Sequence, residues 1–166
     1  MNLPEFVQAL QTLQPLQAEH DRKAHRAVLN WRRHRRLRHY TLHFGKYLNK
    51  LLQNEAAEPR VLIDAVIITM AMANALGISL TSVFSEDFYR KRVNADTCGQ
   101  ILLTSFSLMC KLSEAREHRE DLPYEQKWIE VCGTWFIALL WVVEQFPADL
   151  TIAIPRRWKQ VESNTK

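Results

Sequence analysis

The sequence predicts an all-α fold, a helical bundle in one domain that spans residues 1–166. Two long segments carry almost no charge, one from Val61 to Leu80 and one from Glu130 to Glu144, and their length indicates buried helices. The chain holds only 4 Gly and 6 Pro, and its Val, Ile and Thr residues do not alternate with polar ones. These observations favour helices packed around one core.

The other elements are organised around the segment Val61–Leu80. Its side chains are apolar on every face except at Asp64, which is typical of a core helix or a membrane span. Gly77 is the usual kind of residue to end a helix, so about 16 residues or roughly 24 Å remain, short of the ~20 residues that a bilayer needs. We therefore expect the central helix of a soluble bundle that does not enter a membrane.

Two further features predict a cytoplasmic protein. The N-terminus has no basic start followed by an apolar run, so we expect no signal peptide. Cys98, Cys110 and Cys132 are an odd number of cysteines without a CxxC pair, which indicates reduced, buried thiols and argues against a zinc site.

Apolar periodicity predicts the helices that precede the central one. A short amphipathic helix is expected over Leu3–Leu13, and Pro15 is expected to end it. A long helix follows over residues 24–53, and residues 54–60 form the turn into the central helix.

Three helices are expected directly after the central one, and an internal repeat would add a short terminal helix behind them. The first is short and lies within residues 81–93, the second covers 96–118, and the third is the apolar helix over 125–146, which Pro147 ends. Three tryptophans of the chain are expected to pack in the core and at its rim: Trp128, Trp135 and Trp141.

The second half of the chain resembles a diverged copy of the first, over residues 24–93 and 96–162. Residues 77–81 can be aligned with residues 147–151, and an all-apolar helix precedes both segments. Two such helical hairpins packed together would bury both apolar helices inside one bundle.

Positive charge is concentrated in one segment of the chain. The net charge is +4, yet Arg22–Lys50 carries ten Lys or Arg and no acid, so the rest of the chain is net negative. Cationic side chains of this density neutralise phosphates, either of a small nucleotide or of nucleic acid, and they also suit an acidic protein surface. The predicted contact residues are Arg32, Arg33, Arg35, Arg36, Arg38 and Lys46.

The order of these parts resembles the all-α NTP pyrophosphatases, the MazG-like proteins. Their signature is EExxE on one helix, a spacer, and ExxD opening an apolar helix that ends in a G-[IV]-[DNS]-L turn. In this chain Asp64, the run AVIITMAMANALG and the turn GISL match the second part. Residues 42–46 lie at the place of EExxE, and Gly45 matches a glycine common inside it.

The resemblance implies a magnesium site whose acids are mostly absent here. In the family these acids hold Mg²⁺, a cation that prefers oxygen ligands and activates water against a nucleotide's phosphates. The corresponding places hold Leu42, His43, Lys46 and Val61, which leaves Asp64 alone. We therefore expect binding without the usual hydrolysis. The resemblance also implies a homodimer.

Other residues keep two further kinds of chemistry open. An active pyrophosphatase would use Glu114, Glu117 and Glu130, with Asp64 as a further ligand of Mg²⁺. Solvated surface charge also explains these acids. His39 and His43 lie four residues apart and with Asp64 could hold a transition metal instead.

The sequence thus predicts a MazG-like helical protein that binds a phosphate-bearing ligand, or a protein partner, through a basic helix. One alternative is the active nucleoside triphosphate pyrophosphatase. The other is a helical protein that binds nucleic acid without sequence specificity.

Overall fold

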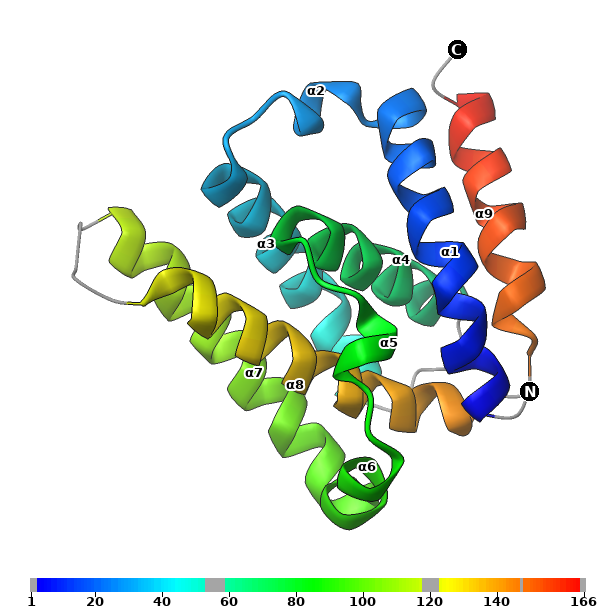
Figure 1. Cartoon of the computed structure of the whole chain (residues 1–166), viewed down its shortest axis with the longest axis vertical. Coiled ribbons are helices and arrows are strands. Elements are labelled where there is room, and N and C mark those ends of the chain that lie inside the picture. Colours follow the sequence, from blue (N-terminus) through cyan, green and yellow to red (C-terminus); the bar gives the residue numbers. More distant parts are fainter. Residues whose placement is uncertain (1–2, 53–58, 118–122, 147, 165–166) are drawn as a thin grey trace.

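The computed structural model describes residues 3–52, 59–117, 123–146 and 148–164. In these ranges it contains nine helices and no strand, so the predicted all-α class is confirmed. Figure 1 shows their arrangement. The helices are α1 (Leu3–Ala24), α2 (Arg26–Leu29), α3 (Arg33–Leu52), α4 (Pro59–Leu76), α5 (Leu80–Val83), α6 (Glu86–Arg92), α7 (Ala95–Glu117), α8 (Tyr124–Glu144) and α9 (Leu150–Asn164).

Two antiparallel helical hairpins form the centre of the fold. One hairpin is α3 with α4 and the other is α7 with α8; α3 packs on α7, and α4 packs on α8. Helices α1 and α9 pack on each other and on α4, so the first hairpin is covered on its outer side. The two hairpins follow the order that an internal repeat would produce, and the duplication itself stays a prediction.

The two apolar helices, α4 and α8, are joined in the core by a hydrogen bond between side chains. Trp135 Nε1 donates to Thr69 Oγ1 over 3.2 Å, and both residues are fully buried. The Trp135 ring also lies 4.5 Å from the Phe44 ring, measured between centroids. Trp128 is buried and Trp141 is half-buried, which confirms that these tryptophans pack in the core and at its rim.

The length and apolar composition of α4 and α8 would also suit a membrane span. By length and composition, Pro59–Leu76 and Tyr124–Glu144 could each cross a membrane, yet 61% and 67% of their apolar windows are buried inside the fold. Core helices of soluble proteins have the same character.

Gly77 ends α4 as predicted. Its φ is +72°, a left-handed conformation that glycine adopts without steric cost. Ile78 N donates to Ala73 O over 3.1 Å, which satisfies a carbonyl of the last helical turn.

The prediction that Pro15 ends the first helix is wrong, because α1 continues to Ala24. A proline inside a helix costs about 3 kcal/mol or more. Tertiary bonds hold this stretch in place. The Gln14 side chain donates to Asn74 Oδ1 and to Ile78 O, and Asn74 Nδ2 donates to Gln14 O.

Three other predictions differ from the structure. The helix expected over 24–53 is divided into α2 and α3, and the first turn of α3 has no acid to balance its arginines at the positive end of the helix dipole. The helix expected within 81–93 is divided at Phe84, whose backbone is extended. Cys98 and Cys132 are buried, but Cys110 is exposed on α7.

Candidate functional site

The basic segment contributes to a long groove, which we name the arginine groove. It lies between the first turns of α3, the last turns of α7 and the first turns of α8, and its volume is about 1060 Å³. Five exposed arginines line it, together with two acids and two aromatic residues. These lining residues are Arg32, Arg33, Arg35, Arg38, Arg116, Glu117, Glu125, Tyr124 and Trp128.

Two of the five arginines are paired with acids across the groove. Arg33 Nη1 lies 3.0 Å from Glu125 Oε1, and Arg38 pairs with Glu117. All four side chains are about half exposed, so water screens these pairs. The pairs connect α3 to α7 and α8.

The other three arginines of the groove have no carboxylate partner among the described residues. The Arg35 guanidinium lies over the Trp31 ring, 4.2 Å from its centroid, and the Arg116 guanidinium lies 5.5 Å from the centroid of Tyr124. Such contacts orient a guanidinium without using its hydrogen-bond donors. Arg32, Arg35 and Arg116 therefore keep positive charge available to a ligand.

Two of the predicted contact residues lie outside the groove. Arg36 is half-buried and acts electrostatically on Tyr40, and its Nε has no partner among the described residues. Lys46 is exposed, with its Nζ 5.7 Å from the centroid of the Tyr47 ring. Arg36 points about 100° away from Arg35 around α3, whereas Lys46 lies about three turns further along the helix than Arg35, which lines the groove.

The four candidate acids do not lie together. Asp64 binds Arg157, Glu117 binds Arg38, and Glu130 is bonded by Lys127 at the exposed surface of α8. The hydrogen bond from Lys127 lowers the pKa of Glu130. Glu114 is an exposed residue of α7. Within the described part of the chain, no three His, Cys, Asp or Glu residues are placed to hold a metal ion, so these residues do not fit a magnesium centre.

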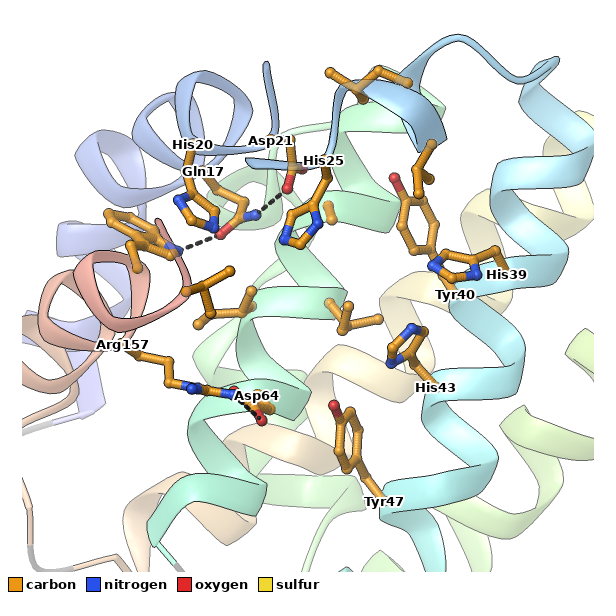
Figure 2. A pocket seen from close by; sticks show the side chains of 17 residues that line it. Gln17, His20, Asp21, His25, His39, Tyr40, His43, Tyr47, Asp64 and Arg157 are labelled. Carbon is orange, nitrogen blue, oxygen red and sulfur yellow. Dashed lines mark hydrogen bonds and ion pairs between the residues drawn. The ribbon is translucent and has the colours of Figure 1, made fainter. Parts of the chain in front are cut away.

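A second site borders the neighbouring face of α3, and we name it the histidine cavity. Its volume is about 370 Å³, within the usual range for small-molecule sites. Figure 2 shows that α1, α3, α4 and α9 surround it and that His25 extends into it from the segment before α2. The polar residues lining it are Gln17, His20, Asp21, His25, His39, Tyr40, His43, Tyr47, Asp64 and Arg157.

An ion pair closes one end of this cavity. Arg157 donates from Nε to Asp64 Oδ1 over 2.7 Å and from Nη2 to Asp64 Oδ2 over 3.1 Å, and both side chains are largely buried. Two parallel bonds of this kind are strong and directional. Burial and the nearby Asp64 carboxylate raise the pKa of Tyr47 to about 12. Because Asp64 and Arg157 neutralise each other, neither charge is available to a ligand.

A chain of hydrogen bonds reaches Asp21 at the opposite end. Trp158 Nε1 donates to Gln17 Oε1 over 2.6 Å, and Gln17 Nε2 donates to Asp21 Oδ1 over 2.7 Å. Asp21 is 6% exposed. Burial raises its pKa to about 6, against smaller opposite effects of His20 and Gln17. No Lys or Arg pairs with Asp21 among the described residues.

Three histidines of the cavity have pKa values below that of a free imidazole. Burial lowers the pKa of His25, His39 and His43. Repulsion from His20 and His39 lowers the pKa of His25 further, and repulsion from His39, Lys46 and His25 does the same for His43. The rings of His39 and His43 meet edge to face with centroids 4.7 Å apart. His43 Nδ1 is buried without a hydrogen-bond partner among the described residues.

The structure thus places His39, His43 and Asp64 around one cavity, but it does not group them as a metal site. Sequence reasoning missed Gln17, Asp21 and Arg157. A signal for the first two was present, because the buried stripe of α1 passes from leucines to Gln14, Gln17, His20 and Asp21. Polar residues on a buried stripe indicate hydrogen-bonded groups or a site.

No family model, curated protein or solved structure matches this chain. The resemblance to the MazG-like proteins therefore stays a prediction.

Proposed function

We propose that the protein binds a ligand with several phosphates in the arginine groove. The observation that supports this most is the position of Arg32, Arg35 and Arg116, which face one groove without a carboxylate partner among the described residues. Guanidinium groups bind phosphate oxygens through paired hydrogen bonds, and a polyphosphate supplies enough charge to meet several arginines together. A nucleoside triphosphate and a single-stranded nucleic acid share this chemistry.

The pairs Arg33–Glu125 and Arg38–Glu117 support the same function. They hold the two arginines at the edge of the groove before a ligand arrives, and exposed pairs of this kind contribute at most about 1 kcal/mol. A phosphate can therefore replace either carboxylate at small cost. The groove is preorganised for anions rather than neutralised by its own acids.

Binding without hydrolysis is part of the proposal. In a MazG-like scaffold Asp64 would be a magnesium ligand, and here both of its oxygens accept bonds from Arg157. The acids of the enzyme alternative are distributed over the groove edge and the exposed surface of α7 and α8. The predicted homodimer and cytoplasmic location stay predictions.

The test compares two triple variants that remove the same charge. Arg32→Gln/Arg35→Gln/Arg116→Gln changes the groove, whereas Lys91→Gln/Arg156→Gln/Lys159→Gln changes exposed cations outside it. ATP binding is measured by calorimetry, and binding of fluorescein-labelled single-stranded DNA by anisotropy over a range of salt concentrations.

We expect the groove variant to bind at least tenfold more weakly and the control variant to stay within about threefold of wild type. For single-stranded DNA, each lost phosphate contact reduces the slope of log K against log salt by about 0.7. If ATP alone binds, the ligand class is a nucleotide; if DNA alone binds, it is a nucleic acid. Equal loss in both variants would refute the groove as the site, and release of pyrophosphate from ATP with Mg²⁺ would refute binding without hydrolysis.

A further inference from the structure

In the histidine cavity, the guanidinium, indole and amide N–H groups already donate hydrogen bonds within the protein, whereas one carboxylate oxygen has no donor among the described residues. Arg157 donates to Asp64, Trp158 to Gln17, and Gln17 to Asp21. The second carboxylate oxygen of Asp21 has no protein donor among the described residues. A neutral imidazole offers one donor and one acceptor, and the two tyrosine hydroxyls of the lining can act as either, so the carboxylate alone gives the lining a preference. A ligand that fits the Asp21 end of the cavity supplies N–H donors to this carboxylate.

We propose that the histidine cavity binds a small organic cation, an ammonium group attached to an apolar or aromatic body. The charge of the lining supports the positive sign. Asp64 is balanced by Arg157, whereas the buried Asp21 carboxylate has no Lys or Arg partner among the described residues, and its neighbour His20 is paired with Glu162. A buried, unpaired charge is costly to the fold, and an ammonium ligand would compensate it.

The apolar part of the lining supports the second half of the proposal. Ile67, Ile68 and Ala71 of α4 form one wall of the cavity, and Trp158 of α9 lies in another. Aromatic faces attract a cation, and the aliphatic wall buries the hydrocarbon that carries it. The volume of about 370 Å³ is far larger than an ion needs and suits an organic molecule.

The surrounding charges limit what can bind. His20 and Glu162 form a pair beside Trp158, and Arg60 lies 3.9 Å from Asp64. On α3, the charge of Arg36 opposes the rise that burial causes in the pKa of Tyr40, and the charge of Lys46 adds to the lowering that burial causes in the pKa of His43. His20 and Arg157 line the cavity but are paired with Glu162 and Asp64, whereas Arg36, Arg60 and Lys46 are not part of the lining. An ammonium group is therefore expected at the Asp21 end, away from Arg157.

The experiment uses three probes of one shape and different charge. Benzylamine, benzyl alcohol and benzoate are titrated into the full-length protein by calorimetry at pH 7.5. We expect benzylamine to bind at least tenfold more tightly than the other two. Alcohol or benzoate binding as tightly as the amine would overturn the proposal.

Two carboxylate variants locate the site. Asp21→Asn keeps the shape of the side chain and removes its charge, and Asp96→Asn removes the same charge from an exposed position of α7. We expect at least a tenfold loss of benzylamine affinity in the first and no change in the second. Unchanged affinity in Asp21→Asn, with a circular dichroism spectrum like that of wild type, would overturn the proposal.

Two further measurements complete the test: the pH dependence of benzylamine affinity, and competition between benzylamine and zinc. Because the pKa of Asp21 is about 6, wild-type affinity for benzylamine should fall roughly tenfold from pH 7.5 to pH 5, as Asp21 and then the histidines become protonated. One equivalent of zinc that binds, displaces benzylamine and is lost on His39→Ala/His43→Ala would identify a metal site instead and overturn the proposal.

Discussion

Asp21 is a carboxyl group that weakens the fold when it is ionised. Its pKa in the folded protein is about 6, above the ordinary 3.8, because burial disfavours the charged form. The folded protein thus binds more protons than the unfolded chain between these two values. The stability that protonation supplies is complete below pH 3.8 and is lost as the pH rises through 6.

We therefore predict that Asp21→Asn stabilises the protein at neutral pH. A shift of about two pKa units corresponds to about 3 kcal/mol at pH 7.5, and the gain should fall to about 1 kcal/mol at pH 4.5. Urea unfolding of both proteins at the two pH values measures this difference. A wild type more stable than Asp21→Asn at pH 7.5 would contradict the electrostatic explanation.

Protonation of the cavity histidines has the opposite effect on stability from protonation of Asp21. The pKa values of His25, His39 and His43 are lowered in the folded protein, so the unfolded chain binds protons first as the pH falls below 6.5. Their contribution to stability is present above pH 6.5 and is lost in acid.

This predicts that His43→Gln reduces the loss of stability between pH 7.5 and pH 5. His34→Gln is the matched control, since His34 is an exposed residue of the same helix. Thermal melts at both pH values measure the effect. The same pH response in His43→Gln and wild type would exclude His43 as a source of acid sensitivity.

At the scale of elements, the contact between α4 and α8 depends on one buried polar pair. Thr69 Oγ1 donates to Ala65 O over 2.8 Å and accepts the bond from Trp135 Nε1. Thr41 on α3 has the same backbone bond, to Leu37 O over 3.0 Å, and no side-chain donor bonds it among the described residues.

Thr69→Val should therefore cost about 1–3 kcal/mol, the usual penalty for a buried donor left without a partner. Thr41→Val removes a hydroxyl from an equally buried helical position and should cost less than about 0.5 kcal/mol. Guanidinium unfolding of the two variants gives the comparison. Equal costs would indicate that the bond to Trp135 contributes nothing.

Local sequence patterns predicted the elements better than their ends. The apolar runs of α4 and α8 and the stop at Gly77 were predictable because periodicity and glycine chemistry are local. The continuation of α1 through Pro15 was not, because it depends on Gln14 bonding residues some sixty positions away. The division between α2 and α3 could have been anticipated from the missing acid at the start of α3.

At the scale of the whole molecule, α3 separates two sites of opposite preference. Its face with Arg35 and Arg38 meets α7 and α8 at the arginine groove, and its face with His39 and His43 meets α1, α4 and α9 at the histidine cavity. The sequence predicted the first from charge density. It could not predict the second, because Asp21 and Arg157 lie far apart in the chain and only the packing of α1 and α9 brings them to α4.

The measurement that tests this separation most directly is the affinity of inorganic triphosphate for three proteins, determined by calorimetry at pH 7.5. The account predicts at least a tenfold loss in Arg32→Gln/Arg35→Gln/Arg116→Gln and wild-type affinity in Asp21→Asn. Triphosphate that binds the groove variant normally, and binds Asp21→Asn more tightly than wild type, would place the anion in the histidine cavity and contradict it.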